Sequence, residues 1–256
     1  MKILKFKKQS KDKYKLYLDN NSDITLYEDV IIKNNLLITK EISDELLEAL
    51  KKQNNDMYAY TLALGYISVK MRSIKEINDY LIKKGFNNLV ANKVSERLIK
   101  EGYLNDLKYT KSFINDSMNL TNKGPQKIKM ELIKYGVNKD IIESEIALID
   151  QKKVEEKLNK LIDKELKIKK GSQNAIKIKI INHFVNLGYS KDLVTSILTG
   201  KEITSDKSKL KKDYAKLYNK YKVKYNGQEL LYFISQKLYS KGYTASDIKE
   251  VLKEEN

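Results

Sequence analysis

Cysteine and tryptophan are absent from these 256 residues, proline and histidine occur once each, and only two of the 50 basic residues are arginine. Without cysteine the chain has no disulfide framework and no thiolate metal site. The single histidine, His183, stands between apolar neighbours, so we interpret it as a helix-surface or partly packed residue and not as a catalytic base. Acidic pairs such as Glu143 and Glu145 are expected to be solvated. We therefore expect no enzyme activity, no cofactor and no metal.

Long apolar runs are missing too. No segment approaches the roughly 18 apolar residues that a membrane span requires, and the basic N-terminus lacks the apolar core of a signal peptide. Apolar residues still make up 41% of the chain, which is enough to build a core although 33% of the residues are charged. The sequence predicts a soluble, cytoplasmic protein, and a monomer because a helical array with a polar last repeat needs no second copy.

The positive charge is large and unevenly placed. The net charge is +16, and residues 171–224 hold half of it, with 12 basic and 4 acidic residues. Such a field suits a polyanion, and nucleic acid is the first candidate. Lysine lacks the planar fork with which arginine reads guanine edges, so this surface favours phosphate contact over sequence-specific readout. A solvated surface with a compositional bias toward lysine explains the same count about equally well.

A repeat organises the chain, and four glycines at intervals of 51, 52 and 54 residues mark it. These are Gly85, Gly136, Gly188 and Gly242. Apolar residues at helical spacing precede each glycine, and a capping residue and a second apolar helix follow it. Ahead of the first glycine, Ser73 and Glu76 have the spacing of a capping box. A period near fifty residues indicates helical hairpins that bury their faces against neighbouring repeats.

The N-terminal residues differ from the rest. Alternating apolar positions within residues 1–27 predict a small antiparallel sheet of about three strands. Ser43 is expected to begin a helix, and Asn55 to cap the next one. We predict a mostly α fold of tandem three-helix, helix-turn-helix-like repeats behind this β element. The predicted divisions are 1–54 (β-rich extension plus a helix), 55–121 (first repeat), 122–170 (second), 171–224 (third) and 225–256 (a partial fourth repeat of two helices).

Three motifs carry a resemblance to a known family. The first is the predicted helix start at Arg72-Ser73, which is followed by Glu76-Ile77. The second is the run RLIKEGYLND from Arg97 to Asp106. The third is Lys123-Gly124-Pro125, which opens a predicted helix that contains Glu131. Together they closely resemble the RecX family of bacterial recombination regulators. The resemblance covers essentially the whole chain and is strongest over residues 58–150. The N-terminal strands look like the extension of the longer family members.

The resemblance implies a curved, elongated array of three-helix repeats and a regulator that is not an enzyme. It implies a protein that binds the RecA recombinase and its DNA filament, lodges in the filament groove, and restrains filament extension and strand exchange during recombination and DNA repair. Some family members also bind DNA directly. Two alternatives stay open: a DNA-binding protein without sequence specificity, for single or double strands, and a helical scaffold for acidic protein partners.

Basic residues recur near the first helix of each predicted repeat, and we expect them to form the interaction surface. Stacking of the repeats could align them into one stripe that contacts DNA or the filament. For any single residue, a solvent-facing lysine without a partner is an equally good interpretation. The predicted contact residues are Lys70, Arg72 and Lys75 in the first set, Lys123, Lys127 and Lys129 in the second, and Lys170, Lys177 and Lys179 in the third.

The 18 tyrosines could include platforms on which bases stack. Tyr189 and Tyr243 directly follow two of the repeat glycines, so we interpret them as packing residues. Three others are open to either interpretation, and we favour the core because large aromatics at helical spacing are usually buried. They are Tyr58, Tyr103 and Tyr109.

Overall fold

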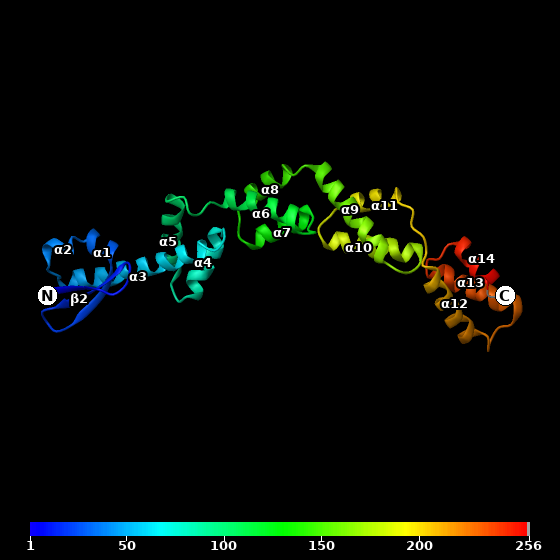
Figure 1. Ribbon diagram of the computed structural model, residues 1–256, viewed down its shortest axis with the longest axis horizontal. Coiled ribbons are helices and arrows are strands. Elements are labelled where there is room, and N and C mark those ends of the chain that lie inside the picture. The colour runs from blue at the N-terminus through cyan, green and yellow to red at the C-terminus, as the bar shows by residue number, and fades with distance from the viewer. Residues whose placement is uncertain (255–256) are drawn as a thin grey trace. The chain divides into compact units, whose positions relative to one another are not determined.

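The computed structural model describes residues 1–254, which form 14 helices and one three-stranded sheet (Figure 1). The chain divides into two compact units. One consists of residues 1–111 with 133–141, and the other of residues 112–132 with the described chain from residue 142 onward. The predicted fold class, mostly α with helical repeats behind a small antiparallel sheet, is confirmed. Residues 255 and 256 of the predicted last repeat lie outside the described residues.

The N-terminal sheet is an antiparallel meander in the order β1-β2-β3, as the alternating pattern predicts. Along β2, Leu16 and Leu18 point to one face and are buried in the first hydrophobic core. Two short helices and the start of a long one cover this core. The elements are β1 (Ile3–Lys8), β2 (Lys13–Leu18), β3 (Asp23–Tyr27), α1 (Glu28–Lys33), α2 (Leu36–Thr39) and α3 (Asp44–Ile67).

Helix α3 belongs to two cores. Ser43 caps its start, since the Ser43 hydroxyl oxygen accepts a hydrogen bond from the Leu46 N–H at 3.1 Å. Leu50 is buried in the first core, and Ala59 is buried in the core of the first repeat. The helix is continuous between them, so the predicted cap at Asn55 is wrong, and the predicted division at 54/55 falls within the helix. Apolar contacts on both sides of Asn55 outweigh its modest helix propensity.

The edge of β3 explains why polar residues occur in the middle of α3. The side-chain amide of Asn54 accepts a hydrogen bond from the Tyr27 N–H at 2.8 Å and donates one to the Thr25 carbonyl oxygen at 3.0 Å. Both backbone groups belong to the outer edge of the sheet, which otherwise has no strand to pair with. Asn54 therefore joins the sheet to the helix and does not end the helix.

Three of the helical hairpins pack on the helix that precedes them. α3 packs with α4 and α5, α9 with α10 and α11, and α12 with α13 and α14. The predicted divisions at 171 and 225 fall between each of the last two hairpins and the helix on which it packs. The last repeat has three helices because α12 shares its core. The bounds are α4 (Ile74–Lys83), α5 (Asn88–Lys100), α6 (Asp106–Leu120), α7 (Pro125–Lys134), α8 (Lys139–Ala147), α9 (Gln151–Ile168), α10 (Gln173–Asn186), α11 (Lys191–Thr199), α12 (Lys207–Tyr221), α13 (Gly227–Ser240) and α14 (Ala245–Glu254).

The predicted helix start at Ser73 and the predicted helix ends at the four repeat glycines are confirmed. Ser73 and Glu76 form the capping box at the start of α4, and all four repeat glycines have positive φ angles just after the first helix of their hairpin. Among the described residues, no helix is both long enough and apolar enough to cross a membrane. The same residues contain no group of three or more histidine, cysteine, aspartate or glutamate side chains that could hold a metal ion.

Candidate interaction surface at the repeat joints

A hydrogen bond links the start of α4 to the turn after α7, and we call this contact the first joint. The Ser73 hydroxyl donates to the Tyr135 carbonyl oxygen at 2.7 Å while its oxygen accepts the Glu76 N–H at 3.1 Å. Ser73 is fully buried. One hydroxyl therefore caps a helix and satisfies a carbonyl group at the end of another helix, where no intrahelical donor is present.

The same contact recurs at equivalent positions of the later repeats. At the second joint the Gly124 N–H donates to the Leu187 carbonyl oxygen at 2.7 Å. At the third joint the Ser172 hydroxyl donates to the Lys241 carbonyl oxygen at 2.6 Å. In every case the acceptor is the residue just before a repeat glycine. The predicted basic sets lie around the donors of these joints, so the structure places them where repeats meet.

The second joint is the tightest because two glycine backbones touch. A Cβ atom added at Gly124 would lie 2.6 Å from both the carbonyl carbon and the carbonyl oxygen of Gly188. The Gln126 N–H also donates to the Gly188 carbonyl oxygen at 3.1 Å. In addition, the Lys157 ammonium of α9 donates to the carbonyl oxygens of Met118 (2.7 Å) and Lys123 (3.2 Å), and burial lowers the pKa of Lys157.

Of the first predicted set, Arg72 is a packing residue. Its guanidinium group lies 3.8 Å from the centroid of the Tyr66 ring and forms an ion pair with Glu76 at 3.2 Å. Only 11% of its side chain is exposed. Lys75 extends over Gly136 and forms an ion pair with Asp79 at 2.7 Å. Lys70 is exposed, and it is the member of this set most available to a partner.

The second set is largely paired with carboxylates. The Lys123 ammonium lies 2.6 Å from Glu131, and that of Lys129 lies 3.3 Å from Glu143. Lys127 is half-buried, and its backbone packs against the turn at Gly188. The helix surface thus neutralises two of these three charges locally, which reduces what they can offer to an anionic partner.

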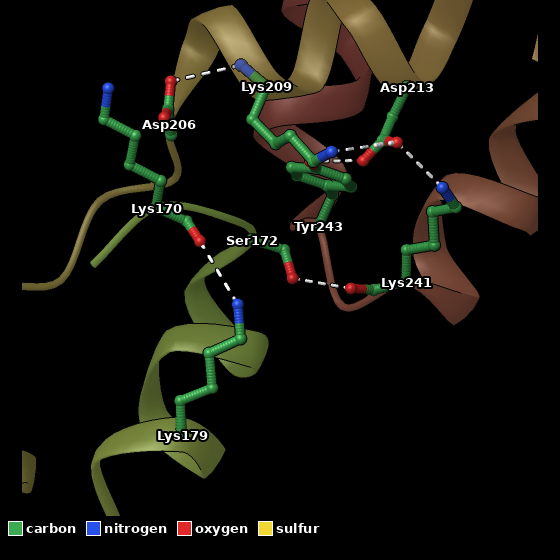
Figure 2. Close-up of polar contacts among 8 residues, drawn as sticks. All are labelled: Lys170, Ser172, Lys179, Asp206, Lys209, Asp213, Lys241 and Tyr243. Carbon is green, nitrogen blue, oxygen red and sulfur yellow. Dashed lines mark hydrogen bonds and ion pairs between the residues drawn. The ribbon is translucent and has the colours of Figure 1, made fainter. Parts of the chain in front are cut away.

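The third set lies at and just before the start of α10. Lys170 and Lys179 are exposed, and the Lys179 ammonium reaches the Lys170 carbonyl oxygen at 3.5 Å (Figure 2). Lys177 is half-buried. Within the described part of the chain, none of the three forms an ion pair with a carboxylate. These lysines lie in residues 171–224 or directly before them, where the charge excess is also largest.

A buried carboxylate stabilises the turn that receives the third joint. Asp213 of α12 accepts hydrogen bonds from the Lys241 ammonium and the Tyr243 hydroxyl, each at 2.9 Å (Figure 2). Burial alone would raise the pKa of Asp213, but the hydrogen bonds from Lys241 and Tyr243 outweigh it and hold the pKa below its usual value. This carboxylate has a structural role, since both of its donors lie in the turn between α13 and α14.

Replacing Asp213 with asparagine is expected to lower the free energy of unfolding at pH 7 by about 1–3 kcal/mol, because charge-assisted hydrogen bonds become neutral ones. A depressed pKa in the folded state contributes stability above the unfolded pKa of 3.8 that is lost as the pH falls through the folded value. The difference between wild type and variant should therefore stay constant from pH 7 to about pH 5 and shrink as the pH falls below about 4, in urea unfolding followed by circular dichroism. A difference that does not depend on pH would contradict this assignment.

Two protein-family models match consecutive parts of the chain. The model described as "RecX, first three-helix domain" matches residues 59–98, and the model described as "RecX, second three-helix domain" matches residues 105–144. A protein of Streptococcus uberis named "Regulatory protein RecX" is 36% identical over 99% of both chains. The chain belongs to the RecX family. A RecX protein of Staphylococcus haemolyticus is 26% identical over 98% of this chain and 96% of its own.

Two solved RecX structures share the fold. One, titled "Crystal structure of regulatory protein RecX", superposes with a TM-score of 0.68 at 22% identity and covers 77% of this chain and 98% of its own. The RecX structure from Lactobacillus salivarius has a TM-score of 0.53 at 28% identity and covers 57% of this chain and 96% of its own. The first matched domain begins within α3 and ends within α5, and α3, α4 and α5 pack together in this RecX-family chain.

The tyrosine predictions are confirmed in part. Tyr189 and Tyr243 are buried, and Tyr109 is only 7% exposed. Tyr58 and Tyr103, for which we favoured the core, are 45% and 55% exposed, so those two predictions are wrong. Tyr58 still makes an edge contact with Phe86, with the ring centroids 5.8 Å apart. His183 is on the exposed surface of α10, as predicted.

The residues that make the joints were not predictable from the motifs described above. Gly124 belongs to the motif that opens a helix, and Ser172 has no predicted role. The signal that could have found them is a small residue just ahead of the first hairpin helix, which occurs as Ser73, Gly124 and Ser172 in successive repeats. Only small residues let two helix ends approach within hydrogen-bond distance, so their recurrence in register with the glycines carries information.

Proposed function

We propose that this RecX-family protein binds the filament that the RecA recombinase forms on DNA and inhibits its activity in recombination and repair. The similarity over 99% of the chain to proteins named "Regulatory protein RecX" carries the proposal. The protein acts as a cytoplasmic monomer and needs no cofactor. Its DNA contacts go to phosphates and do not depend on sequence, because lysine dominates its basic surface.

The proposed mechanism is steric and electrostatic. Exposed lysines at the repeat joints, chiefly Lys70, Lys170 and Lys179, meet DNA phosphates or acidic surface of the filament. Hydrogen bonds at the joints hold consecutive repeats together, so a bound protein spans neighbouring recombinase subunits. A protein wedged against several subunits hinders both the addition of further subunits and the movement of a second DNA strand.

A plain DNA-binding protein is the second candidate. The observation that favours it is the third basic set, where three lysines near one helix start have no carboxylate partner among the described residues. In this case DNA alone would give the full affinity, with the steep salt dependence of counterion release. A filament-binding protein would instead bind the filament more tightly than the same DNA without recombinase.

The test is ATP hydrolysis by the cognate RecA on single-stranded DNA, with this protein titrated below one copy per recombinase subunit. We expect a progressive fall in hydrolysis at substoichiometric ratios, because each bound copy blocks a filament end or several subunits. The Lys123→Glu/Lys127→Glu/Lys129→Glu variant is compared with the wild type in the same hydrolysis assay. Its fold is checked by circular dichroism, because two of these lysines form ion pairs. Unchanged hydrolysis with excess protein and an active recombinase would refute the regulatory role.

A further inference from the structure

A cavity of about 640 Å³ beside the first joint combines aromatic walls with a basic rim. Tyr66 and Tyr80 line it, with ring centroids 4.1 Å apart and planes only 10° from parallel. The Arg72 guanidinium covers Tyr66 at 3.8 Å from the ring centroid, and Glu76 fixes it from the side. Arginine and two tyrosines thus form a preformed stack.

The rim of this cavity carries positive charge that the protein does not use internally. Lys83, Lys84 and Lys134 are exposed, and none of them forms an ion pair within the described residues. The Lys84 ammonium lies over Tyr80 at 5.6 Å from the ring centroid. The two acidic residues of the cavity, Glu76 and Asp79, are already paired with Arg72 and Lys75. The cavity therefore presents a net positive charge next to a stacking surface.

Aromatic stacking and free ammonium groups together recognise a nucleotide in a single strand. Every base has a flat face that stacks on tyrosine, and lysines around it contact the flanking phosphates. Bases of a duplex are stacked on both faces, so a paired base cannot extend the protein stack without leaving its helix. Lysines in the last turn of a helix also offset the helix dipole, but that role requires neither the stacked rings nor the cavity.

We propose that this cavity takes one unpaired base of single-stranded DNA, stacked on Tyr80, with its neighbouring phosphates at Lys83, Lys84 and Lys134. The inference rests on the proposed function in one respect, namely that this protein binds DNA. It assigns a single-strand site to the first repeat, apart from the exposed lysines of the third repeat. The predicted affinity for single strands then exceeds what charge alone gives.

The test measures binding of the full-length protein to a single-stranded DNA oligonucleotide of alternating thymine and 2-aminopurine, whose fluorescence falls when the base stacks. Wild type and Tyr80→Phe should quench the signal equally, because both keep the ring. Tyr80→Leu should lose the quenching and bind single strands about fivefold to a hundredfold more weakly. The affinity for duplex DNA of the same length should stay the same in all three proteins.

A second variant keeps the proposal testable if Tyr80→Leu does not fold. Lys83→Gln/Lys84→Gln/Lys134→Gln should reduce the slope of log affinity against log salt by about 2 for single strands, since each phosphate contact contributes about 0.7. Equal quenching by Tyr80→Leu and Tyr80→Phe, or tighter binding of the matching RNA strand than of DNA, would overturn the proposal. No recombinase is present, so these results stand apart from the ATP hydrolysis test of the regulatory role.

Discussion

Replacing Gly188 with alanine is expected to lower the free energy of unfolding by about 2–5 kcal/mol. Gly188 has a φ angle of +91°, a conformation that costs an L-residue about 1–2 kcal/mol. The added Cβ would also lie 2.6 Å from the Cβ of Lys127, and it would meet the backbone of the same residue. Overpacking of this kind adds about 1–3 kcal/mol because a backbone cannot move aside as a flexible side chain can.

Gly85 provides the matched control for this substitution. It occupies the same position in the first repeat and has a φ angle of +95°, but nothing lies within 4 Å of an added Cβ. Gly85→Ala should therefore lose only the conformational part, about 1–2 kcal/mol. Urea unfolding followed by circular dichroism measures both variants. Equal losses would show that the close approach of Gly188 to the helix start at Lys127 contributes nothing to stability.

Neutralising the exposed lysines of the third repeat is expected to give a large loss of affinity for both single-stranded and duplex DNA. If Lys170 and Lys179 each contact one phosphate, the Lys170→Gln/Lys179→Gln variant should bind DNA about 25- to 60-fold more weakly at 0.1 M salt. The slope of log affinity against log salt should fall by about 1.4 for single strands and about 1.8 for duplexes. Fluorescence anisotropy at several salt concentrations measures both quantities.

Lys123 and Lys129 offer a control with the same change in charge. Both ammonium groups already lie against carboxylates, Lys123 at 2.6 Å from Glu131 and Lys129 at 3.3 Å from Glu143. The Lys123→Gln/Lys129→Gln variant should therefore weaken DNA binding much less than the Lys170→Gln/Lys179→Gln variant. Similar losses in the two variants would mean that affinity follows net charge and not the local exposure of particular lysines.

The features that follow from local sequence were predictable. Helix ends depend on a few neighbouring residues, so Ser73 with Glu76 and the glycine at 85 could be placed from their spacing alone. The strands at residues 3–27 were predictable for the same reason, because a period of two puts alternate residues on one face. The repeat itself was visible because the same local signals return at a nearly constant interval.

Features that depend on tertiary contacts were not predictable. No local pattern shows that Asn54 bonds to a strand edge, so the polar stretch around Asn55 resembled a break between helices. Arg72 looked like a contact residue because its burial depends on Tyr66 and Glu76, which are six and four residues away. The pairing of Lys129 with Glu143 likewise joins separate helices, and charge counting along the chain cannot find such a pair.

Helix α3 restricts how this protein can change in length. The helix carries Leu50 into one core and Ala59 into another, with no loop between them. One residue inserted between these two positions would turn the first apolar face by about 100° relative to the second, since an α-helix has 3.6 residues per turn. A loop between the two cores would accommodate such an insertion. Within the continuous helix α3, the insertion would instead disrupt the packing of one core. The N-terminal sheet therefore has a fixed rotation about the α3 axis relative to the first repeat. A fusion that transfers this sheet to another protein would have to preserve that rotation at the point of fusion within the helix.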